Sequence, residues 1–162
     1  MKRCFFYGSL RSGYWNNRRC VNPTEDKLIG MAQTTAPFRL FINTGHFVPV
    51  AVPSTDGGGY PLIGELWELC DNSAEHVHHL EHGYKDAEFE VAVDGQAPVQ
   101  ATVYFCNRPE ESPYHCNMEH VVEEPSGDYA ELVINWQGCP KRRSPVQVSF
   151  VPTAVPALVE VS

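Results

Sequence analysis

Short apolar runs separated by turn-forming residues dominate the chain. Segments rich in Val, Phe, Tyr and Leu are divided by Gly, Pro, Asn and Asp, which is typical of strands joined by tight loops. Strands this short and this frequent favour a barrel or a strongly curved sheet. We expect strands at Arg3–Tyr7, His46–Val52, Leu62–Leu69, Phe89–Val93, Gln100–Phe105 and Gln147–Val151.

One stretch in the middle of the chain has helix boundaries instead. The pattern predicts a helix from about Ser73 to His82. Asn72 is placed to cap it, and Glu75 follows three residues later, as in a capping box. Gly83 suits the left-handed position that ends many helices. An apolar stripe along this helix should face the core.

A second helix is expected near the end of the folded part. It should run from about Gly127 to Gln137, with Ser126 as its cap and Gly138 as its stop. The residues that follow differ in character, because a basic, proline-bounded connector leads into a tail rich in Pro and Val. We therefore expect one domain over residues 1–137 and a C-terminal extension over residues 138–162.

The composition is that of an ordinary globular protein. Hydrophobic residues make up 43% of the 162 residues, and twelve basic against twenty acidic residues give a net charge of −8. An acidic surface disfavours nucleic acid and anionic membranes as partners. No apolar run approaches the roughly 18 residues that span a bilayer, and Gly8 and Ser9 interrupt the first apolar run too early for a signal peptide. We expect a cytoplasmic protein.

The cysteines fit the same compartment. Their spacing is wide and no CxxC occurs, so neither a zinc site nor a compact disulfide framework is indicated. Free thiols in a reducing cytosol are expected for all six, Cys4, Cys20, Cys70, Cys106, Cys116 and Cys139.

The turn after the first predicted strand is the first candidate site. The strand ends in Tyr7-Gly8-Ser9-Leu10. Glycine lets the backbone approach a ligand closely, and successive free N–H groups in such a turn can bind an anion. A plain turn after a strand explains the same spacing, so both interpretations stay open on these residues alone.

Glu81 is the second candidate. It lies four residues after Val77, so it is only about 40° away around the helix and borders the buried stripe of Ala74, Val77 and Leu80. It also falls in the last turn, where the helix dipole disfavours negative charge. Burial and the dipole should both raise its pKa, which suits a group that shuttles protons. A rim glutamate whose head reaches water is the alternative.

Histidines are dense on the same helix, but they do not form a complete metal site. His78 and His82 share a face, yet no HExxH motif and no third ligand can be identified. A second loose cluster, His115, Cys116 and His120, has no recognised ligand spacing. We expect no metal and no other cofactor.

Six segments, in this order, resemble the γ-glutamylcyclotransferase-like superfamily, including AIG2-like and γ-glutamylamine cyclotransferase proteins. The match extends from about Arg3 to Trp136, and the order of the segments is more specific than any one of them. The segments are Phe6–Asn16, Phe47–Pro53, Gly64–Leu69, Val77–Gly83, Ala101–Tyr104 and Ser126–Tyr129.

The resemblance implies an α+β fold, a small and mainly antiparallel β-barrel with flanking helices. It also implies cleavage of a γ-glutamyl amide, in which the α-amine of the substrate attacks its own δ-carbonyl and releases 5-oxoproline and a free amine. Glu81 would be the general acid/base, and the backbone of Tyr7, Gly8, Ser9 and Leu10 would hold the glutamyl group. The implied partner is a small-molecule γ-glutamyl substrate, and the implied assembly is a monomer or weak dimer.

Two departures from the family pattern concern the region around Glu81. The family's aspartate in the segment before the glutamate is His78 here, and the Tyr-x-Arg that usually follows the glutamate is absent from Tyr84–Phe89. The alternative functions are therefore a non-catalytic binding module on the same fold and an enzyme acting on other amides.

Overall fold

The computed structural model describes residues 1–43, 48–112 and 120–129. Its elements, in chain order, are β1 (Lys2–Phe6), α1 (Trp15–Cys20), β2 (Lys27–Thr34), β3 (Phe38–Asn43), β4 (Val48–Pro53), β5 (Ile63–Leu69), α2 (Asp71–Leu80), β6 (Lys85–Val93), β7 (Val99–Phe105), the 3₁₀ helix η1 (Pro109–Glu111) and β8 (Val121–Glu123).

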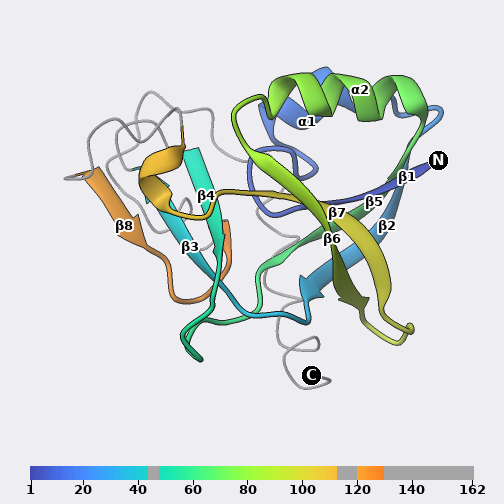
Figure 1. Ribbon diagram of the computed structural model, residues 1–162. Helices are drawn as coiled ribbons and strands as arrows, with labels where there is room; N and C mark the ends of the chain where they lie inside the picture. The colour runs from blue at the N-terminus through green and yellow to red at the C-terminus, as the bar shows by residue number, and fades with distance from the viewer. Residues whose placement is uncertain (44–47, 113–119, 130–162) are drawn as a thin grey trace.

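Five strands close into a barrel in the order β1-β5-β2-β6-β7 (Figure 1). β1 pairs antiparallel with β5, and it closes the barrel through a parallel contact with β7 at Cys4 and Thr102. The other barrel pairs are antiparallel. The expected α+β fold with a small, mainly antiparallel barrel is confirmed, and β1 has a neighbouring strand on each side.

A three-stranded sheet of order β4-β3-β8 lies beside the barrel (Figure 1). Phe38, Leu40 and Ile42 alternate along β3 and are fully buried, whereas Arg39 and Phe41 between them are half-exposed. The sheet is attached to the barrel where β7 ends, because Cys106 N donates to the carbonyl of Ala51 in β4 at 3.0 Å. This junction places β4 next to the C-terminal end of β1.

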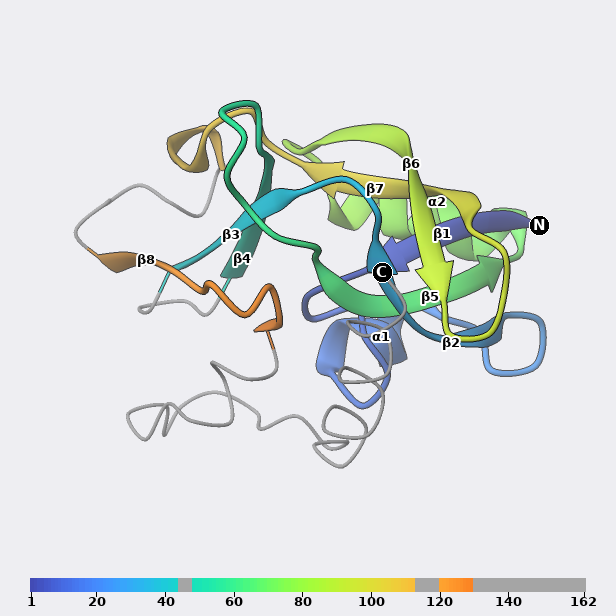
Figure 2. The same cartoon turned by 90° about the horizontal axis from the view of Figure 1, so that it is seen from below.

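The helices α1 and α2 lie together on one side of the barrel (Figures 1 and 2). Between them and the strands is a second apolar cluster, separate from the barrel interior. Its buried members are Cys4, Phe6, Leu10, Cys20, Trp67, Leu69, Val77 and Tyr104. Burial at Val77 fixes the rotation of α2 and therefore determines where the end of the helix points. No helix in the described ranges has the length and apolar character needed to cross a bilayer.

The predicted capping box of α2 is wrong. The helix begins at Asp71 with Cys70 as its N-cap, so Asn72 lies inside the first turn and makes no side-chain cap. The carboxylate of Asp26, from the loop before β2, accepts a hydrogen bond from Cys70 N at 2.7 Å instead. A carboxylate distant in sequence therefore accepts from the N–H group of the N-cap residue, the role that the predicted capping box gave to Glu75.

At its other end, α2 stops one residue before Glu81, which is the C-cap. Tyr84 N donates to the carbonyl of Glu81 at 3.0 Å, and Gly83 in this turn has a φ of +97°. The helix therefore lies two residues earlier in the chain than predicted, with the same length, and Glu81 lies just outside its last turn.

Several elements were not predicted. β2 has no clean alternation, because Gly30 lies at a register shift in its pairing with β5. β3, β8 and the short helix α1 were also missed.

The second predicted helix cannot begin at Gly127, where φ is +72°; Tyr129 is the first helical residue there. The rest of that helix, the strand expected at residues 147–151 and the boundary after residue 137 lie outside the described residues.

Candidate active site

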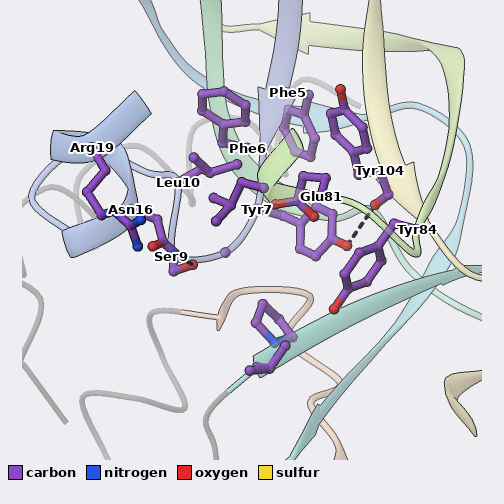
Figure 3. A pocket seen from close by; sticks show the side chains of 14 residues that line it. Phe5, Phe6, Tyr7, Ser9, Leu10, Asn16, Arg19, Glu81, Tyr84 and Tyr104 are labelled. Atoms are coloured by element: carbon purple, nitrogen blue, oxygen red, sulfur yellow. Dashed lines mark hydrogen bonds between the residues drawn. The ribbon is translucent and has the colours of Figure 1, made fainter. Parts of the chain in front are cut away.

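A pocket of about 270 Å³ opens where β1 ends, between α1, the end of α2 and β4 (Figure 3). It contains both regions that the sequence singled out, the Tyr7–Leu10 turn and Glu81. The residues that line it are Phe5, Phe6, Tyr7, Gly8, Ser9, Leu10, Asn16, Arg19, Val48, Pro49, Leu80, Glu81, Tyr84 and Tyr104.

The turn after β1 is a hydrogen-bonded turn in which Arg11 N donates to the carbonyl of Gly8 at 3.0 Å. A side chain at position 8 would be blocked, because a Cβ there would lie 2.5 Å from Cγ of Pro49. Glycine is therefore required for β4 to approach the turn closely. The turn forms one wall of the pocket.

The helix α1 holds this turn through two asparagines. Asn16 Nδ2 donates to Ser9 Oγ at 2.8 Å, and Asn17 Nδ2 donates to the carbonyl of Leu10 at 2.7 Å. Because the Ser9 oxygen accepts from Asn16, its own hydroxyl hydrogen remains available as a donor.

Two buried carboxylates anchor the residues just after the turn. Arg11 Nη1 donates to Asp128 Oδ1 at 2.6 Å, and both side chains are almost completely buried. Glu65 accepts from the backbone N of Ser12 at 2.7 Å, from its hydroxyl at 2.6 Å and from Trp67 Nε1 at 2.9 Å. The turn is thus held rigidly from the side opposite the pocket.

The hydroxyl of Tyr7 holds neighbouring strands together. It donates to the carbonyl of Tyr104 at 2.7 Å and accepts from Ala51 N at 3.2 Å, which joins β1 to β7 and β4. Burial raises the pKa of the phenol well above its usual value, so it stays neutral. Tyr7 therefore contributes backbone and ring surface to the pocket, and its hydroxyl is already engaged.

The Glu81 carboxyl lies in the pocket (Figure 3). The residue as a whole is half-buried, but protein surrounds the carboxyl itself, and desolvation raises its pKa from 4.5 to about 7. None of the described residues donates a hydrogen bond to it. Near neutral pH this group can therefore both accept and release a proton.

Sequence reasoning missed the remaining walls of the pocket. Tyr84 and Tyr104 lie on the far side of Glu81 from Ser9 (Figure 3), while Asn16 and Arg19 come from a helix that was not predicted. A signal for Asn16 was present, because it ends the first family-like segment. Nothing local distinguishes Arg19 from its neighbour Arg18.

The helix histidines do not form a metal site in the structure. His78 is exposed, and its Nδ1 lies 3.5 Å from the Tyr104 hydroxyl. Within the described ranges, no group of three His, Cys, Asp or Glu side chains could hold a metal ion. His115 and Cys116 of the second cluster lie outside those ranges.

A cysteine nucleophile is not favoured by the described thiols. Cys4, Cys20, Cys70 and Cys106 are free, while Cys116 and Cys139 lie outside the described residues. Burial raises the pKa of Cys4 to about 12 and that of Cys106 to about 11, which keeps both thiols protonated.

Relatives of known structure share the fold. An AIG2-like protein from Mus musculus is 24% identical, with a TM-score of 0.58 over 71% of this chain and 86% of that one. YkqA from Bacillus subtilis is 22% identical, with a TM-score of 0.62. The match covers 82% of this chain but only 41% of YkqA.

The sequence comparisons point to the same family. A Methanocaldococcus jannaschii protein named "Putative gamma-glutamylcyclotransferase" is 26% identical over 134 residues, covering 81% of this chain and 98% of that protein. The model of the family described as "Gamma-glutamyl cyclotransferase, AIG2-like" matches residues 4–131, a span that includes both the Tyr7–Leu10 turn and Glu81. The chain therefore belongs to the AIG2-like gamma-glutamyl cyclotransferase family.

Proposed function

We propose that the protein is a γ-glutamylcyclotransferase that converts a γ-glutamyl amide into 5-oxoproline and a free amine. The observation that carries this proposal is the Glu81 carboxyl, which lies in the pocket with a pKa raised to about 7 and accepts no hydrogen bond from the described residues. A structural glutamate would be paired or solvated, whereas an acid/base group needs a free carboxyl near neutrality.

The reaction needs one group that moves a proton over a short distance. The α-amine nitrogen attacks the δ-carbonyl carbon, forming the ring bond, and the ionised Glu81 takes the proton that this nitrogen releases. The amide C–N bond then breaks, and Glu81 returns the proton to the departing nitrogen. Protons and electron pairs balance without any co-reactant, because nucleophile and leaving group belong to one molecule.

The backbone of the Tyr7–Leu10 turn is the proposed holder of the glutamyl group. The turn is fixed from behind by Asn17, Arg11 and Ser12, so its geometry is set before the substrate arrives. An extended γ-glutamyl chain must curl before its amine reaches its carbonyl. A rigid pocket that binds the curled form supplies much of the acceleration through positioning.

The test is release of 5-oxoproline across a panel of γ-glutamyl amides, with Glu81→Gln compared against Glu75→Gln. Glu75 is an exposed residue on the same helix and lies outside the pocket, so it controls for the loss of one charge. We expect Glu81→Gln to lower turnover by at least about 10²-fold, the lower range for a lost acid/base group. The Glu75 variant should match the wild type.

Binding separates this function from the alternative. Calorimetry with 5-oxoproline should show similar affinity for the wild type and Glu81→Gln, because the glutamyl holder is intact. A wild-type protein that binds 5-oxoproline but turns over no γ-glutamyl amide would be a binding module. Unchanged turnover in the Glu81 variant would remove Glu81 from the mechanism.

A further inference from the structure

A second cavity lies at the other end of the barrel from the pocket that contains Glu81. Its volume is about 250 Å³, close to the 270 Å³ of that pocket. The N-terminus and the β6–β7 hairpin mark this end of the barrel, away from the three-stranded sheet (Figures 1 and 2). The two cavities share no lining residue. The residues that line the second cavity are Arg3, Lys27, Ile29, Leu66, Glu68, Val93, Gln96, Ala97 and Val99.

The floor of the second cavity is apolar. Leu66 and Val93 belong to the barrel core and are at most 8% exposed, and Ile29 and Val99 pack against the same core. The valines and Ala97 have short side chains, which leaves space at this end of the barrel. A ligand that enters therefore meets hydrocarbon at its inner end.

The rim carries three charged side chains in one row across three neighbouring strands. Glu68 of β5 lies opposite Arg3 of β1 and opposite Lys27 of β2 in the register of the sheet. Side chains alternate along a strand, so Arg3 lies on the same face as Phe5 and Glu68 on the same face as Leu66. Phe5 and Leu66 both belong to the barrel core. The three charges therefore surround the opening of the barrel instead of lying on its outer surface.

Positive charge exceeds negative charge at this rim. Arg3 Nε lies 3.4 Å from Glu68 Oε1, so the one carboxylate that lines the cavity already has a cationic partner. Lys27 forms no ion pair with a described residue, and Asp94 of the nearby hairpin does not line the cavity. Two cations against one carboxylate is the reverse of the overall balance, a net charge of −8. The rim should therefore attract an anionic group and repel a cationic one.

We propose that the second cavity binds a small carboxylate with an apolar chain, the carboxylate at Lys27 and Arg3 and the chain over Leu66 and Ile29. One cation beyond the Arg3–Glu68 pair matches a monoanion, and charge-assisted hydrogen bonds to a carboxylate are among the stronger ones. The cavity is smaller than the roughly 300–1,000 Å³ of pockets for drug-sized ligands, so the chain must be short. The inference does not depend on the proposed cyclotransferase function.

A series of probes separates the contribution of the chain from that of the charge. The isotopically labelled full-length protein is titrated with acetate, butanoate and hexanoate, and with hexan-1-ol and hexylammonium as neutral and cationic counterparts of hexanoate. Amide NMR shifts locate the binding. We expect hexanoate to shift Gln96 and Ala97 and to leave the Tyr7–Leu10 turn unchanged. Affinity should rise by about fourfold for each methylene that becomes buried, and the alcohol and the ammonium should bind more weakly than hexanoate.

Three variants test the rim. Lys27→Gln should weaken hexanoate binding by about threefold to fivefold, towards the upper range for an exposed ion pair. Glu68→Gln should strengthen it, because it removes the carboxylate that Arg3 contacts. Arg18→Gln has the same change in net charge as Lys27→Gln, at an exposed position that lines neither cavity, and should keep the wild-type affinity. Urea unfolding of each variant checks that the fold is retained.

Four results would overturn the inference. Equal affinity for hexan-1-ol and hexanoate would show that the cavity accepts an apolar chain regardless of charge. Tighter binding of hexylammonium would make Glu68 the group that recognises the ligand. Shifts confined to the Tyr7–Leu10 turn would place the carboxylate in the Glu81 pocket. No shift in any amide would show that side chains close the second cavity in solution.

Discussion

Arg11 and Asp128 form a buried ion pair between the two ends of the folded domain. They are 117 residues apart, their closest atoms, Nη1 and Oδ1, are 2.6 Å apart, and neither side chain is more than 2% exposed. Arg11 follows directly after the pocket turn, and Asp128 follows β8. The position of the turn therefore depends on a residue at the far end of the described chain.

Removal of either partner should destabilise the protein strongly. Arg11→Met or Asp128→Leu leaves one buried charge uncompensated, which costs about 3–5 kcal/mol. The double variant should lose less than the sum of the two single losses, because it leaves no isolated charge. Urea unfolding followed by circular dichroism measures all three free energies. Strictly additive losses would show that the pair is not coupled.

Replacement of Glu65 by an amide side chain should cost little stability, whereas replacement by a hydrocarbon side chain should cost much more. Its three hydrogen bonds come from Ser12 N, Ser12 Oγ and Trp67 Nε1. In Glu65→Gln the amide oxygen can accept from the two N–H groups, while the amide nitrogen donates to the serine oxygen, so we expect a loss of about 1 kcal/mol.

Glu65→Leu leaves the same three donors buried without an acceptor, and it should cost about 3 kcal/mol or more. Thermal or urea unfolding of the two variants gives this comparison directly. Equal stabilities would mean that water replaces the carboxylate behind the turn.

Residues whose environment is local were predictable from the sequence. β1 and β5 are short apolar runs bounded by turn residues, and the structure places them within one residue of the predicted bounds. β3 also alternates clearly at Phe38, Leu40 and Ile42, and its pattern could have been recognised. β2 could not be recognised in this way, because Gly30 and a register shift disrupt its alternation of buried and exposed residues. It is a strand because it pairs with β5 and β6.

The candidate site also has one part that could be predicted from the sequence and another that could not. Glu81 could be placed on the buried side of its helix by counting from Val77, and burial does raise its pKa. The opposing walls could not be predicted, because Tyr104, Pro49 and Arg19 come from three elements that meet only in the folded chain. The helix dipole is not needed to explain the raised pKa of Glu81, because desolvation alone accounts for the direction of the shift.

We propose that the protein resides in a reducing cytoplasm, and a thiol count tests this. The four described cysteines are free, and Cys4, Cys20 and Cys106 among them are buried. Titration with a thiol reagent under denaturing, non-reducing conditions should find close to six reactive groups in protein isolated without reductant. A count near two or zero would indicate disulfides and a different compartment.

The rate of cyclisation should depend on the ionisation of Glu81. The proton acceptor is the carboxylate, and its pKa is about 7, so kcat/KM should rise as the pH increases from 5 towards 8. The substrate amine must also be neutral to attack, which adds a further rise on the alkaline side. A rate that is flat between pH 5 and 8 would contradict a carboxylate base with this pKa.

The pH dependence of the unfolding free energy should report the raised pKa of Glu81 in the absence of substrate. In the folded protein the pKa of Glu81 is about 7, against 4.5 for the free side chain, so the folded state holds this proton more tightly than the unfolded state. Below pH 4.5 both states are protonated and Glu81 adds no difference. As the pH rises from 4.5 to about 7 the unfolded state releases the proton first, and stability falls.

Glu81→Gln removes this dependence, because an amide does not ionise. The variant should match the wild type at pH 4.5 and exceed its unfolding free energy at pH 8 by about 1–3 kcal/mol, because the pKa of Glu81 is about 7 in the folded state and 4.5 in the unfolded state. Glu75→Gln, an exposed change on the same helix, should show no such trend. Urea unfolding at both pH values measures this difference. A Glu81→Gln variant that is no more stable than the wild type at pH 8 would show that the carboxyl is well solvated, and the case for a proton-shuttling Glu81 would lose its physical basis.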